Sequence, residues 1–199
     1  MNQPILSILI LTLETRKKFY DRLLAILTPQ LCDEVEVLVN ADNGEKSIGT
    51  KRNELLNESG GKYVCFIDDD DLITKDYIER ILAAAKLEPD AIGFKKRVMV
   101  DGRFDKEAIH SIRFGKWETK QWKGKTSYLR TPNHLNPVRR DIALHHPFIE
   151  VNHGEDADYS TRIKPEIRTE VFIDRALYVY EYRTNVKRKG EKTNATRKK

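Results

Sequence analysis

The chain has 199 residues, of which 39% are hydrophobic and 34% are charged, and its formal net charge is +5. These values fit one substantial soluble domain, or two very small ones, with a modest core, and they exclude an integral membrane protein. The charge does not make the fold itself basic, because residues 187–199 hold seven lysines and arginines against Glu191 alone.

Residues 5–58 alternate between strand and helix patterns. The apolar run 5–13 is too short to span a bilayer and lacks the features of a signal peptide, so it predicts a strand. Apolar residues at helical spacing predict a helix that ends at Pro29. Valines at alternate positions predict a second strand over 35–39, which a turn separates from a helix over 48–58.

An apolar strand that runs into four consecutive aspartates organises the rest of the chain. Residues 63–67 form an unbroken apolar run after a double glycine, which is typical of a strand buried on both faces. Asp68, Asp69, Asp70 and Asp71 follow at its carboxyl end, where open α/β sheets bind ligands. Four adjacent negative charges favour a hard divalent cation as their partner. We therefore predict a metal site, against the alternative of an acidic turn that merely precedes the next helix.

A third helix follows the acidic run. Thr74 is predicted to cap a helix over residues 75–87, which ends before Pro89. Strand and helix alternating three times predict a parallel sheet with right-handed crossovers. The fold class is therefore α/β, with a mostly parallel nucleotide-binding sheet flanked by helices, although the chain has neither a Gly-x-Gly-x-x-Gly nor a P-loop motif.

The remainder of the domain has shorter elements. Two short strands are predicted at 91–94 and 97–100, before a basic segment, 113–140, in which eight lysines and arginines stand against a single glutamate. Gly154 and the acidic residues after it lead into a short helix that Pro165 ends, and a last strand is predicted at 176–183.

The domain organisation follows from the absence of any internal repeat or linker before the tail. We predict one domain over residues 1–185 and a disordered basic tail, 186–199, which either solubilises the protein or contacts polyanions. The only cysteines, Cys32 and Cys65, both lie among apolar residues. They are predicted to be reduced thiols of the core, which favours a cytoplasmic location.

Five motifs in the same order resemble those of family 2 glycosyltransferases of the GT-A fold, especially the small forms of phages and bacteria. The motifs are Ser7-Ile-Leu-Ile, Asp42-Asn-Gly, Gly49-Thr-Lys-Arg-Asn53, the run of Asp68 to Asp71, and Gly154-Glu-Asp156. The resemblance covers most of residues 4–185. It implies a GT-A-like domain with a C-terminal acceptor-side portion. It also implies transfer of a sugar from a nucleoside diphosphate sugar, such as a UDP-sugar, to an acceptor hydroxyl, in the cytoplasm of the host if a phage encodes the chain.

The resemblance assigns a donor site to the first half of the chain. The residues implied to line the nucleobase and ribose are Thr12, Leu13, Glu14 and Asp42. The family's usual Pro-Thr-Tyr-Asn turn is here Leu-Thr-Leu-Glu, which leaves the identity of the nucleobase open. Lys51 and Arg52 would counter the diphosphate, although the exposed face of a helix explains either residue equally well.

The resemblance also assigns the metal and the catalytic base. Asp70 is the first choice as ligand of Mn²⁺ or Mg²⁺, with Asp68 beside it if the strand continues, and Asp69 belongs to the donor site. Asp156, next to Glu155, would take the proton of the acceptor hydroxyl, although acidic residues also favour a helix N-terminus for structural reasons. No second nucleophile is evident, so direct displacement with inversion is predicted.

The acceptor is less defined. The residues assigned to it are Trp117 and Trp122, which lie among the bases of segment 113–140, and His134 and Asn136, which lie between two prolines. The acceptor is a glycan or a small molecule, or hydroxymethylated DNA as in some phage-type relatives. The basic segment and tail lean toward a polyanion.

Two other functions remain open. A sugar nucleotidyltransferase also binds a nucleotide on an α/β sheet, but it normally has a glycine-rich loop near the N-terminus, and residues 11–18 contain no glycine. A non-catalytic nucleic-acid-binding protein would explain the basic tail and segment. It would leave both acidic clusters unexplained, because they repel phosphates.

Overall fold

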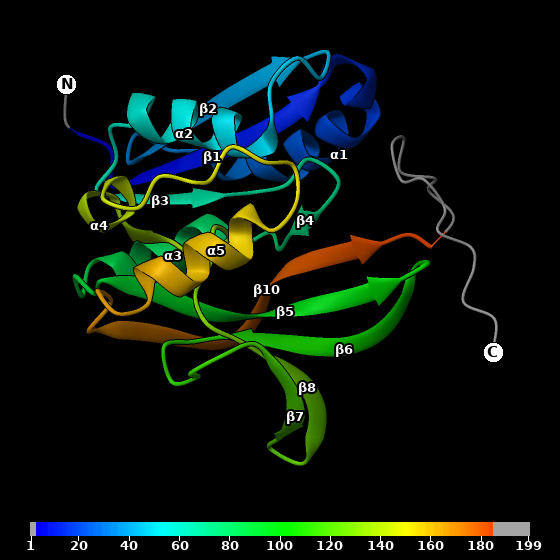
Figure 1. The fold of residues 1–199 in the computed structure, drawn as a ribbon, viewed down its shortest axis with the longest axis vertical. Coiled ribbons are helices and arrows are strands. Elements are labelled where there is room, and N and C mark those ends of the chain that lie inside the picture. Colours follow the sequence, from blue (N-terminus) through cyan, green and yellow to red (C-terminus); the bar gives the residue numbers. More distant parts are fainter. Residues whose placement is uncertain (1–2, 185–199) are drawn as a thin grey trace.

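The computed structural model describes residues 3–184, in which a mixed sheet runs through the molecule with helices packed on it (Figure 1). The strands are β1 (Leu6–Leu13), β2 (Val35–Asp42), β3 (Tyr63–Phe66), β4 (Leu72–Ile73), β5 (Ala91–Val100), β6 (Arg103–His110), β7 (Glu118–Trp122), β8 (Lys125–Arg130), β9 (Val138–Arg139) and β10 (Glu170–Tyr182). The α-helices are α1 (Lys17–Leu27), α2 (Ile48–Glu58), α3 (Tyr77–Ala85), α4 (Arg140–Leu144) and α5 (Glu155–Ile163). The predicted tail lies outside the described residues.

The sheet has a parallel part and a mixed part. Its order is β2-β1-β3-β9-β5-β6-β8-β7, and β10 pairs with β5 and with β4. β1 is parallel to both β2 and β3, and the register places Leu13 opposite Asp42 where β1 and β2 end. These three strands form the predicted nucleotide-binding sheet, so the α/β fold class is confirmed. Beyond β9 the sheet is mixed, because β5 is antiparallel to β6 and parallel to β10.

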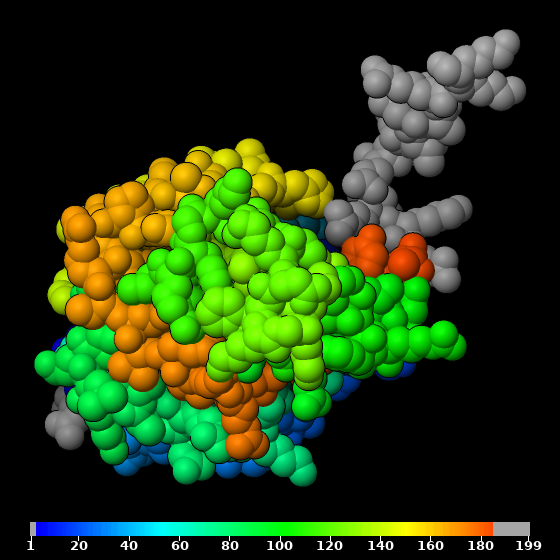
Figure 2. Space-filling model, turned by 90° about the horizontal axis from the view of Figure 1, so that it is seen from below, coloured from blue at the N-terminus to red at the C-terminus, as the bar shows by residue number. Residues whose placement is uncertain are grey.

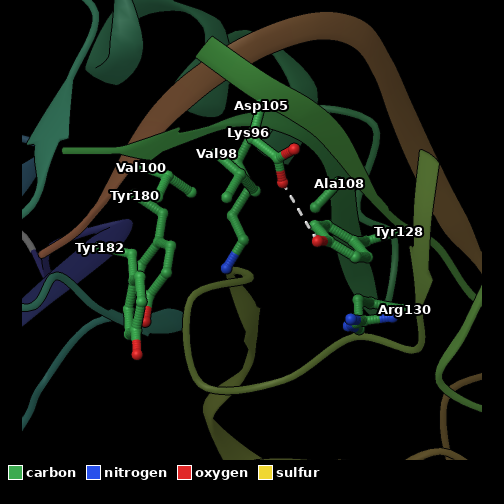
Figure 3. A pocket seen from close by; sticks show the side chains of 9 residues that line it. All are labelled: Lys96, Val98, Val100, Asp105, Ala108, Tyr128, Arg130, Tyr180 and Tyr182. Atoms are coloured by element: carbon green, nitrogen blue, oxygen red, sulfur yellow. Dashed lines mark hydrogen bonds between the residues drawn. The ribbon is translucent and has the colours of Figure 1, made fainter. Parts of the chain in front are cut away.

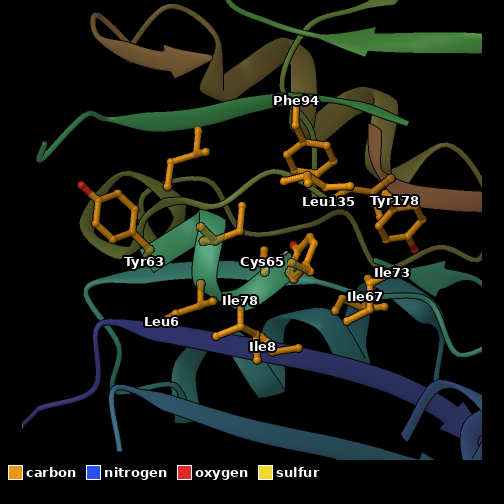
Figure 4. Close-up of a cluster of buried hydrophobic side chains, with 14 of the residues drawn as sticks. Leu6, Ile8, Tyr63, Cys65, Ile67, Ile73, Ile78, Phe94, Leu135 and Tyr178 are labelled. Carbon is orange, nitrogen blue, oxygen red and sulfur yellow. Dashed lines mark hydrogen bonds between the residues drawn. The ribbon is translucent and has the colours of Figure 1, made fainter. Parts of the chain in front are cut away.

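β1 is buried on both faces, as its continuous apolar sequence predicts. Leu6, Ile8 and Ile10 pack on one face with side chains of α1 and α3, in the cluster that Figure 4 shows in part. Leu9 points to the other face, where it joins side chains of α2, α4 and α5. Each fully buried leucine or isoleucine stabilises the fold by about 1.5–3 kcal/mol relative to an exposed one. The two core clusters therefore fix β1, and with it the edge where β1 and β2 end.

Three predicted boundaries differ from the structure. Helix α3 begins at Tyr77 because Lys75 and Asp76 form a turn, so the residue at its N-terminal boundary is Asp76 and the prediction that Thr74 caps the helix is wrong. The backbone N–H of Thr74 donates to Leu177 O of β10 (3.0 Å). The two short strands after it are one strand, β5. The last strand, β10, begins at Glu170, several residues earlier than predicted, because its first half pairs with β5.

The two cysteines differ in environment. Cys65 lies in the core as predicted, and burial raises the pKa of its thiol to about 12. The prediction for Cys32 is wrong, because this residue is exposed in the connection between α1 and β2. Its apolar neighbour Leu31 is itself 42% exposed, so a local apolar sequence did not indicate a core position.

The basic segment folds into a hairpin. β7 and β8 pair antiparallel around a turn at Lys123 and Gly124, both of which have positive φ angles. The hairpin extends from the end of the sheet remote from β2 (Figure 1), and it stands forward on the face seen in Figure 2. Among residues 3–184, no helix is long and apolar enough to cross a membrane.

Candidate functional site

The edge where β1 and β2 end is held together by a buried lysine. Lys51 of α2 is 3% exposed, and its Nζ donates hydrogen bonds to Asp42 Oδ1 and to Thr12 O, both at 2.6 Å. Burial alone would raise the pKa of Asp42, but the hydrogen bonds from Lys51 and from the Lys46 backbone lower it. Leu13 is half-buried beside this pair, and Glu14 is exposed. The alternative that Lys51 merely covers an exposed helix face is therefore wrong.

The four aspartates form a turn and do not continue the strand. β3 ends at Phe66, and the backbone N–H of Asp71 donates to Asp68 O at 3.1 Å. The run is therefore a turn that follows the strand, and each side chain has its own surroundings. Asp68 and Asp70 remain about one-third exposed, whereas Asp69 and Asp71 are buried.

Asp69 is held by Thr12, near the end of β1, and by Arg16, which follows that strand. Thr12 Oγ1 donates to Asp69 Oδ2 at 2.6 Å, and Arg16 donates to both carboxylate oxygens, at 2.5 Å to Oδ1 and 2.9 Å to Oδ2. The same guanidinium lies 2.9 Å from Asp70 Oδ2. Arg16 is not among the residues that the sequence predicts for the site. Its only signal is a basic residue in the turn directly after the first strand.

Arg52 joins the two acidic motifs. Its guanidinium lies 3.2 Å from Asp68 Oδ1 and 3.5 Å from Glu155 Oε1, and it also lies over the ring of Phe66, 4.8 Å from the centroid. His134 Nε2 is 3.4 Å from the other oxygen of Asp68. Burial would raise the pKa of Asp68, but the charges of His134 and Arg52 hold it well below its usual range. Like Lys51, Arg52 is buried, so the alternative that it merely lies on the exposed face of a helix is wrong as well.

Glu155 and Asp156 differ in accessibility although they are neighbours at the start of α5. Glu155 is buried against Arg52, whereas Asp156 is half-buried, and its Oδ1 accepts a hydrogen bond from the backbone N–H of Ala157 (2.8 Å). Gly154 before them has φ +87°, a conformation that glycine adopts readily and that lets the chain turn into the helix. Of the two carboxylates, Asp156 is the one open to a ligand.

Helix α2 is clamped to the segment that leads into α5. The Asn53 side chain donates to Phe148 O (2.9 Å) and accepts from the Phe148 N–H (2.7 Å). One turn earlier, the Gly49 N–H donates to Val151 O at 3.1 Å. A Cβ at position 49 would stand 1.9 Å from the carbonyl oxygen of Ile149. This close approach explains why glycine stands at the start of the Gly-Thr-Lys-Arg-Asn motif.

Replacing Gly49 by alanine is expected to destabilise the protein by about 1–3 kcal/mol, because the clash is with backbone that must move. Chemical denaturation measures the change. Gly115→Ala is the matched control, since a Cβ there meets nothing within 4 Å and its φ is not positive. If both variants unfold at the same denaturant concentration, α2 and the 148–152 segment are not in tight contact in solution.

Asp71 is a buried carboxyl group with an incomplete set of partners. It is 1% exposed, and its Oδ1 accepts from the backbone N–H of Glu181 at 2.9 Å. Within the part of the chain that the structure describes, Oδ2 has no hydrogen-bond partner. Burial and the negative charge of Asp68 raise the pKa of Asp71 to about 8.

The raised pKa of Asp71 predicts a loss of stability with rising pH. The unfolded group has a pKa of about 3.9, so between that value and about 8 only the folded chain keeps the proton. Its contribution is full below pH ~4 and is lost as the pH rises through the folded pKa. We expect the free energy of unfolding to fall between pH 5 and pH 8 by more in the wild type than in Asp71→Asn, which does not titrate. Equal falls in urea denaturation at the two pH values would show that Asp71 is ionised in the folded protein.

The predicted acceptor residues do not gather at one place. His134 reaches Asp68, but Asn136 is 1% exposed, and its amide donates to Ile92 O (3.0 Å). Trp122 packs edge-on against Phe114, with ring centroids 5.2 Å apart. The indole N–H of Trp117 donates to Thr131 Oγ1 at 3.0 Å. Both tryptophans thus have contacts that stabilise the hairpin and its attachment.

The exposed carboxylates of the acidic turn have the chemistry of a site for a hard cation. Asp68 and Asp70 offer acceptor oxygens that remain accessible beside Arg52 and Arg16. Among the described residues, no three His, Cys, Asp or Glu side chains converge into a complete set of metal ligands. One or two carboxylates are nevertheless what Mg²⁺ usually takes from a protein when substrate phosphates and water supply its other ligands.

A family model described as glycosyl transferase family 2 matches residues 20–144. No curated protein matches the chain.

Solved structures with a similar fold include three of Staphylococcus aureus TarS 1–349. The ligand-free structure has a TM-score of 0.68 and 19% identity, covering 89% of this chain and 60% of that one. The complex with UDP has a TM-score of 0.69 at the same identity and coverage. The complex with UDP-GlcNAc has a TM-score of 0.70 and 16% identity, covering 95% of this chain and 62% of that one. The chain thus spans about three-fifths of the length of these structures, and at this identity the likeness concerns the fold.

Proposed function

The chain belongs to glycosyl transferase family 2, and on that premise we propose that it transfers a sugar from a nucleoside diphosphate sugar, a UDP-sugar, to an acceptor hydroxyl. The observation that carries the proposal is the position of Arg52. Its one guanidinium contacts Asp68 of the first acidic motif and Glu155 of the second. Motifs far apart in the sequence therefore converge, as a site that works on one substrate requires.

The donor would lie along the edge where β1, β2 and β3 end. Asp42 accepts hydrogen bonds in this position and is the partner proposed for the base or ribose. Arg16 and Arg52 contact the acidic turn and Lys51 contacts the ends of β1 and β2, and these three cations are the groups proposed to receive the diphosphate. Arginine suits this role because its planar fork donates two hydrogen bonds to phosphate oxygens. UDP and UDP-GlcNAc are present in the TarS complexes of similar fold, which supports the proposed class of donor.

Asp70, together with Asp68, would hold a Mn²⁺ or Mg²⁺ ion. When bound, such an ion stabilises the negative charge that grows on the leaving diphosphate. The protein itself contributes the turn that fixes both carboxylates. It also contributes Arg16, which pairs with Asp69 and Asp70 and so reduces the repulsion between their charges.

Asp156 would act as general base. Its carboxylate is accessible and stands at the start of a helix that packs against the core, so its position is fixed. Removal of the proton from the acceptor hydroxyl prepares the oxygen to attack the anomeric carbon opposite the leaving group. Direct displacement of this kind inverts the anomeric centre.

The test is a panel of nucleotide sugars that differ in base and in sugar, each with and without MnCl2. A UDP-sugar with the metal should raise the melting temperature of the full chain, because a ligand of the folded state stabilises it. The same UDP-sugar should release UDP once an acceptor is supplied. Two results contradict the proposal: no nucleotide sugar raises the melting temperature, or pyrophosphate is released from a nucleoside triphosphate and a sugar phosphate. The second would identify a nucleotidyltransferase.

A further inference from the structure

A cleft of about 360 Å³ lies on the mixed part of the sheet (Figure 3). Strands β5, β6, β8 and β10 line it with Lys96, Val98, Val100, Asp105, Ala108, Tyr128, Arg130, Tyr180 and Tyr182. Tyr180 and Tyr182 form one wall, Tyr128 and Arg130 form the other, and Lys96 points between them. None of the four residues predicted for the acceptor lines this cleft.

The cleft holds two cations, Lys96 and Arg130, and the carboxylates that counter the charge of Lys96 lie beyond ion-pair distance. Within residues 3–184, no carboxylate forms an ion pair with Lys96 or with Arg130, whose NH1 donates instead to the carbonyl oxygens of Glu118 and Leu129 (3.0 and 2.9 Å). The only acidic lining residue, Asp105, already accepts hydrogen bonds from Lys106 and from the Tyr128 hydroxyl. Burial lowers the pKa of both cations, so an anion in the cleft would be favourable to each.

The walls suit a sugar or polyol chain. A tyrosine presents an apolar ring face, on which the C–H groups of a sugar can pack, and a hydroxyl that forms hydrogen bonds. Single-stranded DNA would use exposed aromatic rings as stacking platforms. The indoles of the hairpin are less suited to that role, since Trp122 packs against Phe114 and the Trp117 N–H donates to Thr131. In the cleft, Lys96 lies over the Tyr180 ring and Arg130 over the Tyr128 ring (4.8 and 5.0 Å to the centroids), so each cation and its ring form one wall together.

The cleft adjoins the acidic motifs. The Asp68 N–H donates to the Tyr178 hydroxyl (3.2 Å) and the Glu181 N–H donates to Asp71 (2.9 Å), on the strand β10 whose Tyr180 and Tyr182 line the cleft. On the other wall, Thr131 follows Arg130 and shares a hydrogen bond with Ser160 (2.6 Å), one turn after Asp156 on α5. A ligand held by Lys96 would therefore lie beside the proposed base. This is where an acceptor must bind, because a general base must reach the proton that it removes.

From this arrangement we infer that the cleft is the acceptor site and that the acceptor is an anionic glycan, a sugar or polyol chain that carries phosphate or carboxylate groups. The inference rests on the proposed function. It adds the class of acceptor and identifies Lys96, Arg130 and the three tyrosines as the residues that select it.

The test is a titration of the full chain, with labelled alanine and valine methyl groups, followed by NMR in the absence of any donor. The probes are a hyaluronan tetrasaccharide, which carries carboxylates, a glycerol phosphate oligomer, which carries phosphates, neutral chitotetraose and a thymidine tetranucleotide. We expect at least one anionic glycan to shift the methyl signals of Val98, Val100 and Ala108, and chitotetraose to bind at least tenfold more weakly. Which of the two anionic probes binds tells phosphate from carboxylate.

Variants assign the binding to the cleft. Lys96→Met and Arg130→Gln should each weaken the anionic probe at least tenfold, whereas Arg97→Met should not, since this exposed neighbour on β5 does not line the cleft. Lys96→Met also removes a positive charge that acts on Asp71, so a loss of binding in that variant has two explanations. Arg130→Gln leaves Lys96 and Asp71 in place and therefore separates them. Equal binding of chitotetraose, methyl shifts away from the cleft, or a tighter complex with the tetranucleotide would each overturn the inference. Failure of every nucleotide sugar to bind, while the anionic probe still binds the cleft, would refute the proposed function alone.

Discussion

Asp156→Asn is expected to lower acceptor-dependent sugar transfer by about 10²–10⁴-fold, the usual contribution of a general base. The amide keeps the size of the carboxylate and its hydrogen bond to the Ala157 N–H, but it cannot take a proton. Donor binding should be unchanged, because Arg52 contacts Glu155 and not Asp156. Rates of UDP release at saturating donor, with donor affinity from a thermal-shift titration, measure the two effects separately.

Asp158→Asn is the matched control for the base. It removes the same charge from the first turn of α5, where Asp158 pairs with Arg162 four residues later. That partly exposed pair is worth only about 0.3–0.5 kcal/mol, so transfer should change little. If Asp156→Asn weakens the donor as much as it slows transfer, Asp156 belongs to the donor site and another group is the base.

Asp70→Asn is expected to reduce transfer by about 10²-fold or more, since a bound cation supplies several kcal/mol of charge stabilisation and each 1.36 kcal/mol is a factor of ten. The fold should survive, because Asp70 is about one-third exposed and has one ion-pair partner, Arg16. EDTA should inhibit the wild type to a similar degree, and added MnCl2 should restore it. Asp33→Asn, at an exposed site before β2, is the control for loss of a charge. Full turnover in EDTA would refute the metal assignment.

The sequence predicted the edge formed by β1, β2 and β3 well because parallel strands impose it. Once these strands are recognised from their apolar patterns, their carboxyl ends must lie together, and Asp42 lies at the end of β2 while the acidic run follows β3. Helix α2 also has the predicted bounds, because the Ser47 side chain caps its start and a double glycine follows its end.

What the sequence did not predict depends on contacts between distant segments. In the acidic turn Arg52 and His134 contact Asp68, whereas Arg16 contacts Asp69 and Asp70, and no local pattern encodes those partners. β5 continues through two lysines because Lys95 pairs with Asp174 while Lys96 enters the cleft. The cleft inferred to bind the acceptor has no local signal in the sequence for the same reason, since its walls come from four strands, and β10 joins them only by pairing with β5.

The clamp between α2 and the 148–152 segment has a consequence for motion. Backbone and side-chain hydrogen bonds tie the two together at Gly49 and at Asn53, so the helix that carries Lys51 and Arg52 and the segment that leads to Asp156 belong to one cooperative unit in local unfolding. Their amide protons should exchange with solvent at a common opening free energy. In the proposed mechanism, opening that lets a spent nucleotide leave would come from the other flank, where the acidic turn meets Arg16, and the proposed base would stay aligned between successive turnovers.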